Sequence, residues 1–91
     1  MNRSIFQYNL TQLTTLSIIQ TDITEINDET FVDLPNIQSL TLSLNRNLVH
    51  IGTNTLAGLS ALTTLDLTHN YITDLSSGMF VGLSSITHID L

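Results

Sequence analysis

Two aspartates and two histidines in the second half of the chain are the side chains best suited to chemistry. Asp66 lies close to His69 in the sequence, and His88 lies close to Asp90. Imidazole and carboxylate groups are common ligands of zinc and other divalent metals, and carboxylates also bind lysine or arginine side chains. The spacing gives no closed set of metal ligands, so we predict no metal site and no cofactor. Two interpretations of the aspartates remain open. They could bind a basic group of a partner, or they could simply form a solvated acidic surface.

The sequence carries no motif of an enzyme active site. Cysteine is absent, and there is no Gly-x-Ser-x-Gly, no phosphate-binding loop and no His-Glu-x-x-His. A serine, a histidine and an aspartate could be brought together on paper, but an open surface would neither exclude water nor position a substrate. We therefore expect no catalytic residues and no enzyme activity.

Composition narrows the class of protein further. The 91 residues suit one domain, and they include 2 basic and 8 acidic residues, for a formal net charge of −6. A nucleic-acid-binding surface needs clustered basic side chains, so we expect no nucleic-acid partner. The longest apolar run, residues 79–81, is far shorter than the roughly 18 residues that cross a membrane. The first residues also lack the apolar core of a signal peptide.

Leucine and isoleucine recur in a fixed frame that runs along most of the chain. Residues 62–75 read Leu-x-x-Leu-x-Leu-x-x-Asn-x-Ile-x-x-Leu, and the same frame begins at Leu13, Ile37 and Ile86. Successive frames start 24, 25 and 24 residues apart, and the longer interval comes from one extra residue in 45–48. Self-similarity at such a period is the signature of a stacked repeat architecture.

Each frame predicts a short strand followed by a segment that returns the chain. Side chains alternate between the two faces of a strand, so Leu65 and Leu67 should point inward while Asp66 points to solvent. Stacked copies would then form a parallel sheet and one continuous core. The asparagine after the strand, Asn45 or Asn70, should bond backbone groups that the turn leaves inside.

These repeats resemble leucine-rich repeats of the 24-residue "typical" type, as in Toll-like receptors and related ectodomains. The resemblance covers residues 10–91, and the departures are Thr21 in place of asparagine and Leu56 in place of phenylalanine. It implies an α/β-type repeat solenoid. The expected form is a right-handed coil of about four turns, with a concave parallel β-sheet, a mostly irregular or 3₁₀ convex side, and no caps at its ends.

The frame also predicts which residues build the core. Phe31 and Phe80 should stack as a spine on the return side, where Ile72, Leu75 and Leu83 complete the core wall. The residues expected to have structural roles are Leu13, Leu16, Ile18, Phe31, Ile37, Leu40, Leu42, Asn45, Leu62, Leu65, Leu67, Asn70 and Phe80. The expected segments are repeats at 10–33, 34–58 and 59–82, a truncated repeat at 83–91, and the degraded end of a preceding repeat at 1–9.

In the resembled family the concave face is the usual partner-binding surface, so the resemblance implies a protein ligand. Outward strand positions should align into columns across neighbouring repeats, which makes Asp66 and Asp90 direct neighbours that could receive a basic patch. Ile19 and Leu44 are apolar at positions expected to face outward, as Ser43 also is. Either a hydrophobic contact site or local packing at the corner would explain them. The candidate partner-binding residues are Thr41, Thr64, Asp66, Thr68, His69, His88, Asp90, Ile19 and Leu44.

Two other roles remain open beside ligand recognition. The chain could be a structural spacer in an array that binds elsewhere, or an intracellular scaffold or regulator, since the absence of cysteine suits a reducing compartment. The uncovered apolar strand at 86–91 leads us to expect a fragment of a longer array, or an oligomer that hides this end. The resemblance favours an extracellular or cell-surface setting, whereas the sequons at Asn2 and Asn9 are no more frequent than chance. His50 and Tyr71 are expected to be ordinary surface residues.

Overall fold

The computed structural model describes residues 12–32, 34–73, 75 and 77–91. The expected preceding repeat at 1–9, with both sequons, lies outside the described residues. The elements in chain order are β1 (Thr15–Ser17), β2 (Glu25–Ile26), β3 (Ser39–Thr41), β4 (His50–Ile51), β5 (Thr64–Asp66), the 3₁₀ helix η2 (Ser77–Phe80) and β6 (His88–Asp90).

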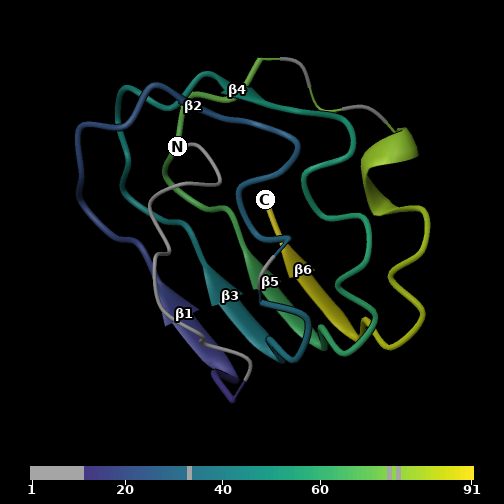
Figure 1. The fold of residues 1–91 in the computed structure, drawn as a ribbon. Coiled ribbons are helices and arrows are strands. Elements are labelled where there is room, and N and C mark those ends of the chain that lie inside the picture. The colour runs from purple at the N-terminus through teal and green to yellow at the C-terminus, as the bar shows by residue number, and fades with distance from the viewer. Residues whose placement is uncertain (1–11, 33, 74, 76) are drawn as a thin grey trace.

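Four parallel strands form one wall of the molecule, in the order β1-β3-β5-β6. Figure 1 shows them side by side, with the chain crossing to the opposite wall and back between one strand and the next. The strands begin 24, 25 and 24 residues apart, which is the interval of the sequence frame. The predicted parallel sheet and repeat solenoid are therefore confirmed.

The opposite wall is more regular than the sequence suggested. The predicted 3₁₀ structure is present as η2, but β2 and β4 also pair in parallel as a second, two-stranded sheet. Backbone bonds extend this pairing at both ends, because Val49 N donates to Thr24 O at 3.1 Å and Gly52 N donates to Ile26 O at 2.8 Å. The repeats that contain β1 and β3 are thus joined to each other on both walls (Figure 1).

Gly52 marks a close approach between two repeats on this wall. A Cβ atom at position 52 would lie 2.1 Å from Oδ1 of Asp28, a residue of the preceding repeat. The same carboxylate oxygen accepts the backbone N–H of Asn54 at 3.1 Å. Glycine is therefore needed here so that the Asp28 side chain can cap the turn that follows β4.

The core lies between the two walls and is made of the inward residues of the frame. Leu65, at the centre of β5, is 1% exposed between the more accessible Thr64 and Asp66, as strand alternation predicts. The buried apolar residues are Ile26, Phe31, Leu34, Ile37, Leu40, Leu42, Leu48, Ile51, Leu56, Leu59, Leu62, Leu65, Leu67, Met79 and Leu83.

Several predicted core residues are less buried than expected. Phe31 is buried, but Phe80 is only half-buried, because Met79 takes the buried position beside it. Phe80 nevertheless packs against the core cluster. Leu75 was expected in the core wall, and it is instead 40% exposed. It borders an open hollow of about 180 Å³ that Leu67 and other residues line.

The first repeat is also more open, since Leu13, Leu16 and Ile18 pack against the core but are half-buried. Two threonines show the opposite deviation. Thr30 and Thr55 are fully buried, although their side chains are polar. The Thr55 hydroxyl donates to Ile26 O at 3.4 Å, so its burial does not leave the polar group without a partner.

Asn45 carries out the predicted role of the asparagine. Its side-chain N–H donates to Ile18 O in the preceding repeat at 2.8 Å. Its side-chain oxygen accepts the backbone N–H of Thr21 at 2.9 Å and the Thr21 hydroxyl at 2.7 Å. Thr21, which replaces asparagine in the first repeat, also accepts the backbone N–H of Ile23 at 3.4 Å.

Asn70 repeats this arrangement in the next turn of the chain. Its side-chain N–H groups donate to Leu42 O and to Leu67 O, the latter at 2.9 Å. Its oxygen accepts the backbone N–H of Asn45 at 2.9 Å. Both side-chain amides therefore join one repeat to its neighbour, as the sequence predicted.

Candidate partner-binding face

The outward side chains of β1, β3, β5 and β6 form what we call the outer sheet face. The strand register aligns them into two columns, as predicted. The first column is Thr15, Ser39, Thr64 and His88, and the second is Ser17, Thr41, Asp66 and Asp90. Most of these side chains are exposed, while Ser39, Thr41 and Asp66 are half-buried.

The two aspartates of the second column differ in their surroundings. One Asp66 carboxylate oxygen accepts the Thr68 hydroxyl at 2.7 Å and the Thr68 backbone N–H at 2.9 Å. These two hydrogen bonds lower the pKa of Asp66, and the nearby His69 lowers it further. Asp90 is exposed. Asp66 is thus held ionised and oriented by its own strand end, with Asp90 beside it in the register.

His88 is oriented by a row of threonines at the start of the strands. Thr63 and Thr87 each donate a hydroxyl to a carbonyl of the preceding repeat, at Gln38 and Thr63 respectively, both at 3.0 Å. The Thr87 oxygen also lies 3.0 Å from Nδ1 of His88. The same hydroxyl therefore joins the preceding repeat to the His88 ring and fixes the position of that ring on the outer sheet face.

The column beyond the strand ends does not fully match its prediction. Ile19 is 45% exposed and Thr68 is half-buried, but Ser43 is only 7% exposed. The prediction of an outward Ser43 was wrong, because neighbouring repeats on both sides cover a side chain this small. The backbone bonds from Gln20 N to Ser43 O and from Leu44 N to Thr68 O, both 3.2 Å, continue the parallel pairing past the strands.

A left-handed residue ends this pairing in each repeat. The φ angles of Gln20, Leu44 and His69 are 59°, 58° and 60°. This conformation is unfavourable for side chains other than glycine, asparagine and aspartate. It turns the chain so that the next residue, Thr21, Asn45 or Asn70, bonds between repeats. Sequence reasoning missed it, since leucine and glutamine give no signal for a left-handed turn.

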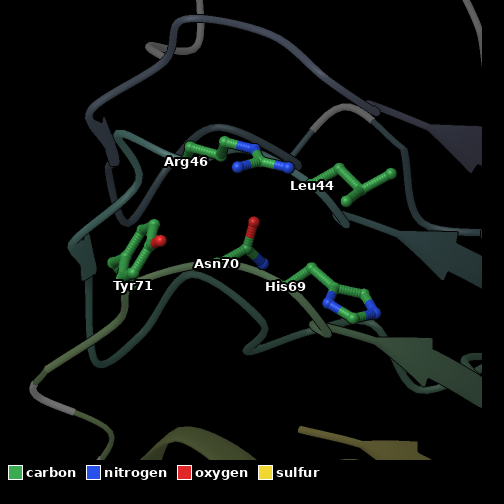
Figure 2. A pocket seen from close by; sticks show the side chains of 5 residues that line it. All are labelled: Leu44, Arg46, His69, Asn70 and Tyr71. Atoms are coloured by element: carbon green, nitrogen blue, oxygen red, sulfur yellow. The ribbon is translucent and has the colours of Figure 1, made fainter.

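The strand ends also border a hollow that the sequence did not reveal. It has a volume of about 280 Å³ and is lined by Leu44, Arg46, His69, Asn70 and Tyr71. Figure 2 shows Arg46 and Leu44 on one side of it, and His69, Asn70 and Tyr71 on the other. Tyr71 is exposed, as expected of a surface residue. The one signal in the sequence was the extra residue in 45–48, where Arg46 lies.

The candidate residues therefore fall into two groups. Thr41, Thr64, Asp66, His88 and Asp90 share the outer sheet face, with Thr68 and Ile19 just past the strand ends. His69 and Leu44 belong to the hollow. Among the described residues, no three histidine, aspartate or glutamate side chains are grouped as a metal site would require. No helix in the same part of the chain is long and apolar enough to span a membrane.

Comparison with known proteins identifies the family. The family model described as Leucine rich repeat matches residues 1–46 and 39–91, so the chain belongs to the leucine-rich repeat family. Domains of this family generally mediate protein–protein interactions. The comparison with curated proteins returns no match.

Proposed function

We propose that this chain is a protein-recognition module that binds its ligand through the outer sheet face. The observation that carries the proposal is the alignment of exposed polar side chains on strands paired in register. Side chains on a rigid sheet lose little conformational entropy when a partner binds, which favours affinity from a modest surface. The family to which the chain belongs supports the same role.

The acidic end of this face indicates the chemistry of the partner. Asp66 and Asp90 are neighbours in the register, and the hydrogen bonds from Thr68 keep Asp66 ionised. Two adjacent carboxylates repel each other slightly, and a lysine or arginine of the partner would relieve that repulsion. We therefore propose a protein ligand with a basic contact patch.

The test is partner retention by a charge-reversed variant. The wild-type chain, Asp90→Lys and Glu25→Lys are immobilised and compared for the proteins they retain as salt is raised. Glu25 is the matched control because it is also an exposed acidic residue but lies on β2, in the sheet of the opposite wall. A ligand of the proposed kind stays on wild type and Glu25→Lys, leaves Asp90→Lys, and is weakened by salt.

The competing role is that of a structural spacer, which predicts a different result. If every retained protein binds the three chains equally, the outer sheet face does not carry recognition and the proposal fails. An intracellular scaffold or regulator would also bind through this face. In that case the ligand would be an intracellular protein. Co-localisation of the retained protein with this chain would establish the compartment.

We further propose the finer features of the fold and its context. The coil is right-handed, in keeping with the handedness of nearly all parallel β crossovers. Its repeats at 10–33, 34–58, 59–82 and 83–91 make about four turns of the "typical" type. The setting we propose is a receptor-like or adhesive protein, with a binding role and no catalysis of its own.

A further inference from the structure

We propose that the hollow beside Arg46 binds a carboxylate side chain of the protein ligand, with its apolar stem against Leu44. This inference rests on the proposed function and adds one contact to it. The ligand would then present an acidic residue next to the basic group that Asp66 and Asp90 attract. A volume of about 280 Å³ admits such a side chain, since one water in the liquid takes up about 30 Å³.

Charge is the first argument for this ligand. The chain has a formal net charge of −6, and its basic residues are Arg3 and Arg46. Arg3 lies outside the described residues. Arg46 has no hydrogen bond or ion pair with any residue that the structure describes, and its exposed guanidinium borders the hollow. Asp22, at the equivalent corner of the preceding repeat, does not neutralise it through an ion pair. A cation that has no ion pair among the described residues of an acidic protein is a ready contact for an anion.

The second argument is the state of the other polar groups around the hollow. Both N–H groups of the Asn70 amide are used, because they donate to two backbone carbonyls, and its oxygen accepts the Asn45 N–H. It therefore shapes the floor without offering a bond to a ligand. Figure 2 shows the Arg46 guanidinium above this floor, with the His69 ring and the Tyr71 ring on the opposite side. Among the residues that line the hollow, Arg46 carries a permanent positive charge and the largest number of donors.

The third argument is how the hollow arises. The repeat containing Arg46 has one residue more at the corner than its neighbours. This added residue lies in a turn that is closed by the bond from Leu48 N to Asn45 O, at 2.9 Å. Tyr71 N then donates to Leu48 O at 3.1 Å, so the next repeat stays attached beyond the turn. The extra residue thus opens a recess between two repeats that are otherwise in register.

The choice of a carboxylate follows from the lining. A planar guanidinium matches the two oxygens of a carboxylate with two parallel hydrogen bonds. Leu44 is held beside it in a left-handed turn, with a φ of 58°, and supplies an apolar contact for methylene groups. Glutamate and aspartate side chains combine these two features.

The test uses sodium butyrate as the probe, titrated into the 91-residue chain at constant ionic strength. The NMR signals of the Arg46 Nε–H and of the His69 and Tyr71 rings report on the hollow. We expect these signals to shift and saturate, while the rings of His50 and His88 serve as internal controls and stay unchanged. Acetate, which has no stem to contact Leu44, should bind more weakly, and butylammonium should leave the signals of the hollow unchanged.

Two variants make the result specific. Arg46→Gln should weaken butyrate binding at least about tenfold, whereas Arg46→Lys should retain part of it because one charge remains without the planar fork. The proposal is overturned if Arg46→Gln shifts like wild type, if chloride reproduces the shifts, or if His88 shifts equally. Such a failure would not change the result expected for partner retention by Asp90→Lys. Conversely, if partner retention did not depend on Asp90, butyrate could still bind in the hollow.

Discussion

Asp66 illustrates how a single side chain on the outer sheet face also stabilises the element that carries it. Its carboxylate accepts two hydrogen bonds from Thr68, and these bonds exist at full strength only while the carboxylate is ionised. Because they lower the pKa of Asp66 in the folded chain, folding and proton binding at this residue oppose each other. The same ionised carboxylate that is proposed to bind the ligand therefore also affects the stability of the folded chain in acid.

A pH series on Thr68→Val checks this link. The unfolded chain binds the proton at Asp66 near the ordinary pKa of 3.8 and the folded chain at a lower pH, so the stabilisation is present above 3.8 and is lost as pH falls through the folded value. We expect Thr68→Val to lower the unfolding free energy by about 1 kcal/mol at neutral pH. That difference should shrink in strong acid. Urea titrations measure it, with Thr15→Val as the control, because Thr15 lies two strands away from Asp66 and the effect of its substitution should stay constant with pH.

At the scale of elements, the two walls are held in register by different devices. The four-stranded sheet relies on backbone pairing and on the side-chain amides of Asn45 and Asn70. The two-stranded sheet relies on β2 and β4 and on the Asp28 carboxylate, which fits only because residue 52 has no Cβ. The second device has no counterpart in the repeat frame.

Gly52→Ala tests the close approach to Asp28. The new Cβ would displace the carboxylate and break its bond to Asn54 N. Since the displaced atom ends an exposed side chain, we expect a loss of only about 1 kcal/mol of unfolding free energy. The same substitution should cost much less in an Asp28→Ala background. Gly58→Ala is the control: its φ of +88° makes it costly in open space, so its effect should not depend on residue 28.

At the scale of the whole molecule, stability is carried by contacts between adjacent repeats. On the two inner strands, each inward leucine lies between the equivalent residues of its neighbours, as Leu65 does between Leu40 and Ile89. In such an array the loss of one interface weakens both adjoining repeats. The centre of the sheet should therefore be more sensitive to truncation than its periphery.

Leu65→Ala should lower the unfolding free energy by about 2–5 kcal/mol, because it opens a cavity where burial is complete. Leu75→Ala removes the same atoms from a side chain that is 40% exposed and should cost well under half as much. Thermal or urea unfolding of the two variants compares them directly. Equal losses would mean that position 65 is not at the centre of the core.

The sequence predicted the parts of this molecule that depend on periodicity. Alternation with period two placed Leu65 inside and Asp66 outside, and their equivalent positions in successive frames placed Asp66 beside Asp90. It could not predict Thr55, because a buried hydroxyl is tolerated only where a carbonyl such as Ile26 O is in reach. Nor could it predict the hollow at Arg46, since the path of an added residue depends on the space that the side chains of the next repeat leave.

The turn at residues 45–48 changes the shape of the surface without changing how the strands pair. The added residue changes the outline of the surface, yet Thr41 still pairs with Asp66, as Ser17 does with Thr41. Variation in length at this corner is therefore uncoupled from the pairing that keeps the molecule folded. A lineage of such chains could vary the corner freely while the strands stay under constraint, so that new binding specificities arise without a new fold.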